Sequence, residues 1–218
     1  MTSTGLRAQP LGDSAITIAF GTERSPELLK RIQAAARSLR AAKIPHVEDT
    51  VPAYLALTVF YDALHTSYRE MAEQLLDTCE RAGAWSLKAA ETSQHRIPVH
   101  YDGIDLEEVA AACSLTPEEV IKRHTKRSYA VELLGFVPGF AYMSELDAKL
   151  QLPRRAQPRP RVAAGSVAIA GAQTAVYPLE TPGGWHIIGR TDTVMFDPSR
   201  EPPALLRPGD TVRFERVT

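Results

Sequence analysis

The chain has 218 residues, and its 25 Lys and Arg against 26 Asp and Glu give a net charge of −1. A general nucleic-acid-binding protein needs a basic excess to displace counterions from phosphates, so this balance argues against that class. No apolar run reaches the roughly 18 residues of a membrane span, and residues 1–10 hold no apolar signal segment, so we expect a cytoplasmic protein without membrane attachment.

The first half of the chain shows strands and helices in alternation. Ala15–Phe20 is a short apolar run typical of a strand, and Ser25-Pro26 then predicts a helix start, because Ser caps a helix and Pro suits its first position. Val47–Val51 and Leu55–Tyr61 follow as two predicted strands. We expect one strand, one helix and two strands up to this point.

A second helix is predicted from Ser67 onward, where Ser67 and Glu70 match a capping box and Gly83 is the expected C-cap. The order strand–helix–strand–strand–helix makes up most of a ferredoxin-like unit. Its fourth strand has two candidates, Trp85–Ala89 and Arg96–Tyr101. The sequence therefore predicts a small N-terminal ferredoxin-like α/β domain.

Glycine and proline are concentrated in the C-terminal part, since residues 135–218 hold 8 of the 13 Gly and 10 of the 16 Pro. After two helix starts at Asp105 and Thr116, short strands with Gly and Pro turns indicate a barrel or a sandwich. The predicted strands are Tyr129–Phe136, Val162–Ala170, Ala175–Pro178, Trp185–Gly189, Val194–Phe196 and Thr211–Val217. This shift in composition predicts an α+β protein of two domains, residues 1–92 and 93–218.

Several enzyme signatures are absent from the sequence. It has no G-x-S-x-G, H-E-x-x-H or C-x-x-C pattern, so we expect no serine hydrolase elbow and no metal site. Gly184–Thr191 has the glycine spacing of a P-loop, but its interior is bulky and Arg190 stands in place of the lysine. We therefore do not interpret this stretch as a P-loop. Cys79 and Cys113 lie among apolar neighbours and are expected to be buried thiols.

A basic segment stiffened by proline, Pro153–Arg161, is the first candidate binding element. It carries Arg154, Arg155, Arg159 and Arg161 and no acid. The guanidinium group binds carboxylate or phosphate through two parallel hydrogen bonds, so these arginines predict a site for an anion. The alternative is a solvated loop whose arginines form structural ion pairs.

Two glycine-marked segments could form the walls of a pocket. Gly135–Tyr142 holds three aromatic residues, including Tyr142, although for Phe136 we favour a place in the core. Gly183 and Gly184 permit positive φ and close approach of a ligand, and Trp185 after them is expected to cover a pocket or an interface. A plain hairpin turn with a core Trp is the alternative.

Four further polar side chains are candidates for substrate contacts. His124 lies on the apolar side of a predicted helix, where a packed or capping histidine is the favoured interpretation and a role in the site the other. Gln173, Thr174 and Tyr177 could donate neutral hydrogen bonds to an amide or a carboxylate, or could decorate the surface. No residue is assigned a catalytic role.

Seven motifs in this order together resemble one family, that of the 5-oxoprolinase B subunit, also called allophanate hydrolase subunit 1 or the KipI-like family. They are Gly12–Ala15, Val51–Tyr54, Leu134–Phe140, Ala164–Gly171, Pro182–Trp185, Ile188–Thr191 and Phe196–Pro198. The resemblance runs from about Leu11 to Phe214. It implies that the C-terminal domain is a cyclophilin-like β-barrel.

The resemblance also implies a function and partners. It implies a protein that works with the 5-oxoprolinase C subunit, bound tightly, and the A subunit, bound more weakly, to open 5-oxo-L-proline to L-glutamate with ATP as co-substrate. The chain alone is then not an autonomous enzyme. The alternatives are an inhibitor of a sensor histidine kinase and one component of an allophanate or urea amide hydrolase. With the C subunit, we expect Trp185 and Phe140 to help bury a large interface.

Overall fold

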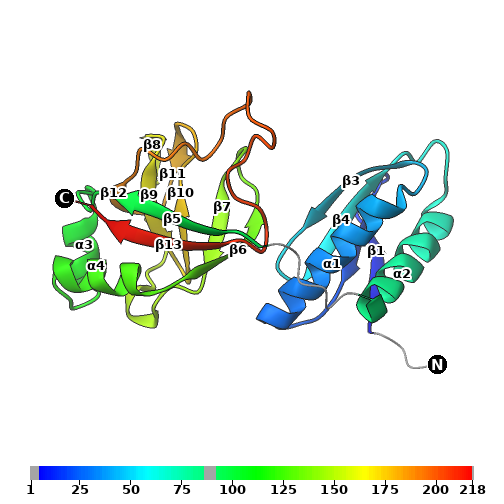
Figure 1. Ribbon diagram of the computed structural model, residues 1–218, viewed down its shortest axis with the longest axis horizontal. Coiled ribbons are helices and arrows are strands. Elements are labelled where there is room, and N and C mark those ends of the chain that lie inside the picture. The colour runs from blue at the N-terminus through cyan, green and yellow to red at the C-terminus, as the bar shows by residue number, and fades with distance from the viewer. Residues whose placement is uncertain (1–4, 86–91, 218) are drawn as a thin grey trace. The chain divides into compact units, whose positions relative to one another are not determined.

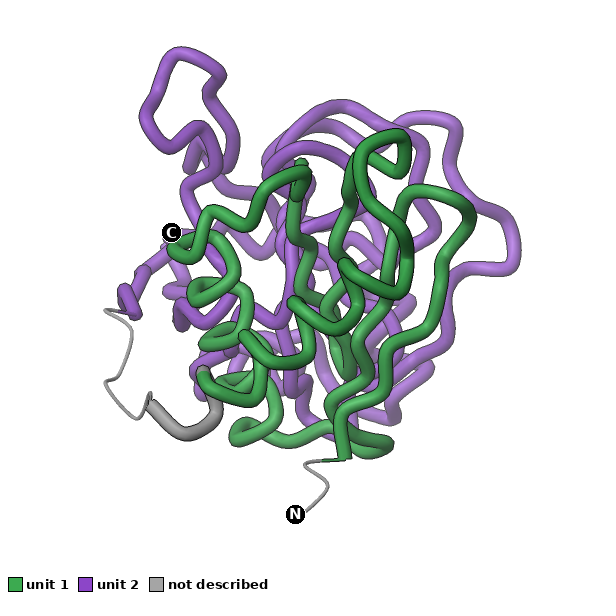
Figure 2. Tube along the Cα trace, turned by 90° about the vertical axis from the view of Figure 1, so that its right-hand side faces the viewer, with its two compact units in different colours: residues 1–91 green, residues 92–218 purple. Residues whose placement is uncertain are grey.

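The computed structural model describes residues 5–85 and 92–217, and the contacts within it divide the chain into two compact units, Met1–Glu91 and Thr92–Thr218 (Figure 2). Within the described ranges, no helix combines the length and the apolar character that crossing a bilayer requires. Each unit has its own hydrophobic core.

The first unit is a four-stranded antiparallel sheet with two helices packed against it (Figure 1). Its elements are β1 (Arg7–Pro10), β2 (Ala15–Ala19), α1 (Pro26–Ala42), β3 (Val47–Pro52), β4 (Ala56–Tyr61) and α2 (Tyr68–Trp85). The strands lie in the order β1-β2-β4-β3. Apolar side chains of β2 and β4, such as Ile16 and Val59, pack against Ile32 of α1 and Leu75 of α2.

Both helices of this unit begin where their capping residues predict. The Ser25 hydroxyl accepts a hydrogen bond from the Leu28 amide at 3.0 Å. Ser67 and Glu70 form the reciprocal bonds of a capping box, with the Glu70 amide 3.3 Å from the Ser67 hydroxyl. The helix end predicted at Gly83 is wrong, because α2 continues through this residue to Trp85.

The fourth strand of this sheet differs from the ferredoxin-like expectation. In the described part of the chain it is β1, which comes before the first helix and pairs antiparallel with β2. Of the two candidates for a strand after α2, Arg96–Tyr101 belongs to β5 of the second unit, and Trp85–Ala89 lies outside the described residues except for the helical Trp85. Arg7–Pro10 is mostly exposed and shows no apolar alternation, so only its backbone pairing marks it as a strand.

The second unit is built on a nearly closed seven-stranded sheet, consistent with a cyclophilin-like barrel (Figure 1). Its strand order is β12-β9-β10-β7-β6-β13-β5, and a two-stranded sheet of β8 and β11 accompanies it. The bounds are β5 (Gln94–Val99), α3 (Leu106–Ala112), α4 (Pro117–Lys126), β6 (Tyr129–Leu134), β7 (Ala141–Ser144), a 3₁₀ turn (Ala148–Leu150), β8 (Arg159–Val162), β9 (Ser166–Ala170), β10 (Gln173–Val176), β11 (Thr181–Gly183), β12 (His186–Arg190) and β13 (Thr211–Arg216). A bridge between His100 and Arg190 joins the two ends of the sheet.

Two predicted strands of this unit differ from the structure. The stretch Val162–Ala170 is two strands, because Gly165 with φ of 81° makes a turn between β8 and β9. The stretch Val194–Phe196 is no regular strand, and only an isolated bridge joins Phe196 to Ala204. Glycine at a left-handed position is the local reason for the first difference.

Strand β9 is buried on both faces, because a separate cluster of side chains packs on each of them. The candidate site lies in one of these two clusters. Val167 and Ile169 point into the core of the barrel, whereas Ala168 and Ala170 belong to a second cluster with Phe140, Tyr177 and Trp185. Successive side chains of a strand point to opposite faces, so this second cluster covers the outer face of the sheet. The segments around β7, β8 and β11 thus form an aromatic layer outside the barrel.

Candidate functional site

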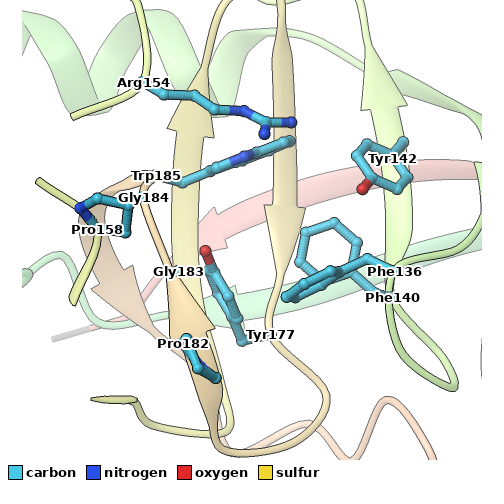
Figure 3. A pocket seen from close by; sticks show the side chains of 10 residues that line it. All are labelled: Phe136, Phe140, Tyr142, Arg154, Pro158, Tyr177, Pro182, Gly183, Gly184 and Trp185. Carbon is cyan, nitrogen blue, oxygen red and sulfur yellow. The ribbon is translucent and has the colours of Figure 1, made fainter. Parts of the chain in front are cut away.

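An aromatic pocket of 170 Å³ lies in this outer layer (Figure 3). It is lined by Phe136, Phe140, Tyr142, Arg154, Pro158, Tyr177, Pro182, Gly183, Gly184 and Trp185. Three segments that are far apart in sequence, and that the sequence singled out, therefore meet here. They are the aromatic segment before β7, the arginine segment before β8 and the Gly-Gly-Trp turn after β11.

The aromatic side chains form a mutually perpendicular cluster. The ring of Phe140 lies 4.9 Å from that of Tyr142, 5.3 Å from that of Tyr177 and 5.6 Å from that of Trp185, all edge to face. Such contacts are favourable because the positive ring edge meets the negative ring face. Phe140 is thus the centre of a rigid wall, and its neighbours are held in place around it.

Two polar groups of the pocket are not engaged elsewhere in the described part of the chain. The Arg154 guanidinium lies at the same end of the pocket as Trp185, and the Tyr142 hydroxyl lies across from it (Figure 3). Among the described residues, neither group has a hydrogen-bond or ion-pair partner. A cation and a hydroxyl above an aromatic floor suit a small anionic ligand with an apolar ring.

Arg155 and Arg159 contact the protein itself. The Asp105 carboxylate, 1% exposed, accepts two bonds from Arg159 at 2.9 and 2.6 Å and one from Arg155 at 3.0 Å. Asp105 also accepts the Ile187 amide of β12 at 2.7 Å, and Arg155 further donates to Glu108 at 2.8 Å. The carboxylate thus connects the arginine segment to the barrel. For Arg155 and Arg159 the structure contains structural ion pairs, which were the alternative to an anion site.

Arg161 and Gln173 lie away from the pocket lining. The Arg161 side chain is 82% exposed, with the Glu180 carboxylate 3.7 Å away. Gln173 donates to the Glu132 carboxylate at 3.3 Å. Of the four arginines, the structure places only Arg154 among the pocket-lining residues.

His124 and Thr174 are fully buried in the barrel core and are not among the residues that line the aromatic pocket. Thr174 donates its hydroxyl proton to the Ala168 carbonyl at 3.1 Å, so it accepts from Nε2–H of His124 at 2.9 Å. Nδ1 of His124 then accepts the Tyr101 hydroxyl at 2.7 Å. The imidazole is therefore neutral, and burial lowers its pKa from 6.5 to about 3.

Tyr177 and Gly183 form one packing unit at the base of the pocket. A Cβ atom on Gly183 would collide with the Tyr177 hydroxyl, so glycine is needed here for close approach of a side chain rather than of a ligand. Neither Gly183 nor Gly184 has positive φ, contrary to the expectation from sequence. Burial raises the pKa of Tyr177, while the amide of Trp185 bonds its hydroxyl and opposes this shift.

Three aromatic residues have the opposite burial to that expected. Phe136, expected in the core, is 58% exposed at a left-handed φ of 70° and lines the mouth of the pocket. Trp185 and Phe140, expected to help bury an interface, are already buried within this chain. The strained loop around Phe136 explains the first difference, since Pro138 and Gly139 prevent the strand from continuing.

The sequence does not mark Asp105, or the pocket residues Pro158 and Pro182, as members of the site. Asp105 is recognised only as a helix start, where its side chain forms no cap bond and instead binds the arginines. An acid followed by fifty residues and then an arginine cluster carries no local signal, because the pairing depends on the closure of the barrel. Pro158 is expected only to stiffen the arginine segment, and both prolines line the cavity.

The sequence of this chain is similar to a known family of domains and to two named proteins over most of its length. Residues 6–206 match the family model described as carboxyltransferase domain, subdomain C and D. The chain belongs to this family. It is also 40% identical over 222 residues to the 5-oxoprolinase B subunit of Bacillus subtilis, covering 96% of this chain and 92% of that protein. The 5-oxoprolinase B subunit of Escherichia coli O157:H7 is 40% identical, covering 95% and 94%.

Solved structures agree with the fold. The protein TTHA0988 superposes with a TM-score of 0.82 at 41% identity, covering 94% of this chain and 40% of that longer one. The Pyrococcus horikoshii protein PH0987 gives a TM-score of 0.56 at 40% identity, covering 97% of both chains. Urea carboxylase of Kluyveromyces lactis gives a TM-score of 0.77 at 18% identity, covering 98% of this chain and 22% of that one, which is a likeness of fold.

Proposed function

We propose that this chain is the B subunit of an ATP-dependent 5-oxoprolinase, which opens 5-oxo-L-proline to L-glutamate in the cytoplasm. The observation that carries the proposal is the near-full-length similarity, 36–40% identical, to three proteins that bear the name of the 5-oxoprolinase B subunit. The proposal includes tight binding to the C subunit and weaker binding to the A subunit.

The pocket in the second unit fits one part of this reaction. 5-Oxoproline is a flat five-membered lactam with one carboxylate, and the pocket offers a guanidinium, a phenol hydroxyl and an aromatic wall. In our proposal Arg154 binds the carboxylate or a phosphoryl oxygen of the activated lactam, and Tyr142 bonds the ring amide. The aromatic rings cover the apolar face of the ring.

The chemistry explains why ATP is required. An amide is a poor electrophile, and transfer of the γ-phosphoryl group of ATP to the lactam oxygen makes the ring carbon reactive toward water. Water adds to this carbon, the C–N bond breaks with the ring nitrogen leaving as the protonated amine, and a second water releases phosphate from the resulting acyl phosphate to give L-glutamate. Such a transfer needs cations aimed at the phosphoryl oxygens. Because the sequence holds no P-loop, we propose that ATP binds where this chain meets its partner proteins, and that this chain supplies substrate-binding groups rather than a nucleophile.

The test is reconstitution with the A and C subunits of the same organism. L-Glutamate formed from 5-oxoproline and ATP should require this chain together with both partners, and this chain should co-elute with the C subunit in size-exclusion chromatography. The control mixture omits this chain. The proposal is wrong if glutamate forms equally without this chain, or if the purified chain alone turns over 5-oxoproline with ATP.

A further inference from the structure

The register of the first sheet brings two potential metal ligands together. Val47 of β3 pairs with Tyr61 of β4, so the next residues outward, His46 and Asp62, lie opposite each other where the two strands end. The Asp62 amide donates to the His46 carbonyl at 2.9 Å, which extends the ladder by one bond. These two positions are therefore fixed by the sheet and do not depend on a long loop.

A tight turn returns a third ligand to the same place. After Asp62 the chain turns, with the His65 amide bonded to the Asp62 carbonyl at 3.2 Å and the Leu64 amide bonded to Oδ1 of Asp62 at 3.0 Å. An Asp side chain that caps its own turn is a stable local structure. It places Nδ1 of His65 2.6 Å from Oδ2 of Asp62.

The two imidazoles face each other across this turn. His46 has a left-handed φ of 68°, which is uncommon outside glycine, and its ring stacks on that of His65 with centroids 5.3 Å apart and planes 5° from parallel. One ligand atom from each of His46, Asp62 and His65 lies within 4.8 Å of the others. Both imidazoles are exposed, so an ion can reach them from solvent.

We propose that His46, Asp62 and His65 form a binding site for a divalent transition-metal ion such as Zn²⁺. Two imidazole nitrogens and one carboxylate oxygen are ligands that zinc prefers, and three protein ligands leave a fourth position for water or an external group. The ion takes the place of the proton between His65 and Asp62, and the side chains separate slightly to reach zinc–ligand distances of about 2.0–2.2 Å.

The nature of the ligands predicts selectivity. Imidazole suits zinc, copper and nickel, whereas magnesium and calcium prefer sites made of oxygen atoms. We therefore expect Zn²⁺ to bind and Mg²⁺ not to compete. The site belongs to the first unit and uses none of the residues of the aromatic pocket, so metal binding and substrate turnover can be tested separately.

The experiment is Zn²⁺ titration of the untagged full-length chain by isothermal calorimetry. One equivalent should bind, and His46→Ala and His65→Ala should each weaken the affinity by about tenfold or more, the low end of the losses seen when a metal site is perturbed. Zn²⁺ should raise the melting temperature of the wild type and not of these variants. Substituting Co²⁺ should give the intense visible absorption of a tetrahedral site.

Two matched variants serve as controls. Leu64→Ala alters a side chain that is 93% exposed in the same turn, and His100→Gln removes an imidazole from the other unit. Both should bind Zn²⁺ as the wild type does. Because His46 and His65 are exposed, their variants should melt as the wild type does without metal. Absence of Zn²⁺ binding at micromolar concentration, or unchanged binding in the His46→Ala, His65→Ala double variant, would overturn the proposal.

Discussion

Arg154 differs from the other arginines of its segment in what its guanidinium contacts. Arg155 and Arg159 are held by Asp105, and Arg161 points to solvent beside Glu180. Arg154 lines the pocket without an acidic partner among the described residues. A cation left without a counter-charge beside an aromatic wall is available to an anionic ligand, and this makes the arginines separable by mutation.

Arg154→Ala should lower the activity of the reconstituted complex by about ten- to a hundredfold, which is the loss of rate expected when one charged hydrogen bond to the substrate is removed. The melting temperature of this variant should stay unchanged, because Arg154 makes no hydrogen bond or ion pair with the other described residues. Arg154→Lys should fail to restore the rate if the contact is bidentate. Arg161→Ala is the control and should keep full activity. Equal rates for Arg154→Ala and wild type would remove Arg154 from the proposed site.

The stability of the barrel depends on pH through His124. In the folded chain it is neutral, with Tyr101 and Thr174 as partners and the ring of Phe214 stacked 4.6 Å away. Its pKa falls from 6.5 to about 3 on folding because burial disfavours the charged form. Between pH 6.5 and about pH 3, His124 binds a proton in the unfolded chain but not in the folded chain. The stability of the fold therefore falls as the pH falls through this window.

We therefore expect the free energy of unfolding to drop by up to about 1.4 kcal/mol per pH unit between pH 6.5 and 5, the slope of one proton. Most carboxylates titrate below this range, so the histidine effect is separable from theirs. Urea denaturation at several pH values measures the slope. A His124→Gln variant should be less stable but flat over this window. An unchanged slope in that variant would show that another group is responsible.

At the scale of elements, Asp105 at the start of α3 holds the loop before β8. Its carboxylate binds Arg155, Arg159 and the backbone of β12, so it fixes the loop that carries Arg154 and Pro158.

Asp105→Asn leaves two partly buried guanidinium groups without their counter-charge. The free energy of unfolding should fall by about 3 kcal/mol or more. Arg159→Ala should show part of this loss, whereas Glu108→Gln, on an exposed side chain, should cost little. Denaturant unfolding measures all three, and an unperturbed Asp105→Asn would contradict the role.

Gly183, the last residue of β11, and Gly184, which follows it, differ in the expected effect of an added methyl group. A methyl group on Gly183 collides with Tyr177, whereas on Gly184 its nearest neighbour is Pro158 at an ordinary contact of 3.6 Å. Gly183→Ala should therefore destabilise the chain by about 1–3 kcal/mol and displace Tyr177 from the pocket wall. Gly184→Ala should be close to neutral. Thermal melting compares the two, and equal melting temperatures would show that the wall adapts without cost.

The elements that sequence analysis predicts well are those with local signals. Apolar periodicity and capping residues such as Ser25 and Thr116 locate the helices, because these interactions join residues three or four apart. Strand β1 and the split between β8 and β9 escape it. Strand β1 is mostly exposed and pairs with β2 through its backbone alone, and the break between β8 and β9 follows from the left-handed backbone of Gly165, so neither leaves an apolar pattern in the sequence.

The candidate site is predictable in its segments but not in its side chains. The aromatic, arginine and Gly-Gly-Trp segments do meet in one pocket. Composition cannot tell which arginine faces the cavity, because Asp105 lies about fifty residues earlier in the chain. His124 and Gln173 resemble site residues in being polar and close to predicted strands, and only burial and pairing separate them from the pocket.

At the scale of the whole molecule, each unit has a separate core. The second unit has its own closing elements, since β5 pairs in parallel with β13 and inserts Ile97 and Val99 into the barrel core. The buried Asp210 carboxylate secures this edge by accepting the amides of Ser93 and Arg207, both at 2.9 Å. A barrel of this kind needs β5, because without it β13 would be an open edge.

The fragment 92–218 should therefore fold on its own, whereas the fragment 101–218 should not. The longer fragment retains β5 and the Ser93 contact of Asp210, and its size of about 130 residues is typical of one domain. The shorter one loses two core side chains and the whole parallel pairing of β13 with β5. Urea unfolding followed by tyrosine and tryptophan fluorescence should give a single cooperative transition for residues 92–218 and none for residues 101–218. The two units would not be independent if residues 92–218 aggregated or unfolded without a transition while the full chain unfolded cooperatively. The Asp210→Asn variant of the longer fragment serves as an intermediate, since it weakens the edge without removing the strand.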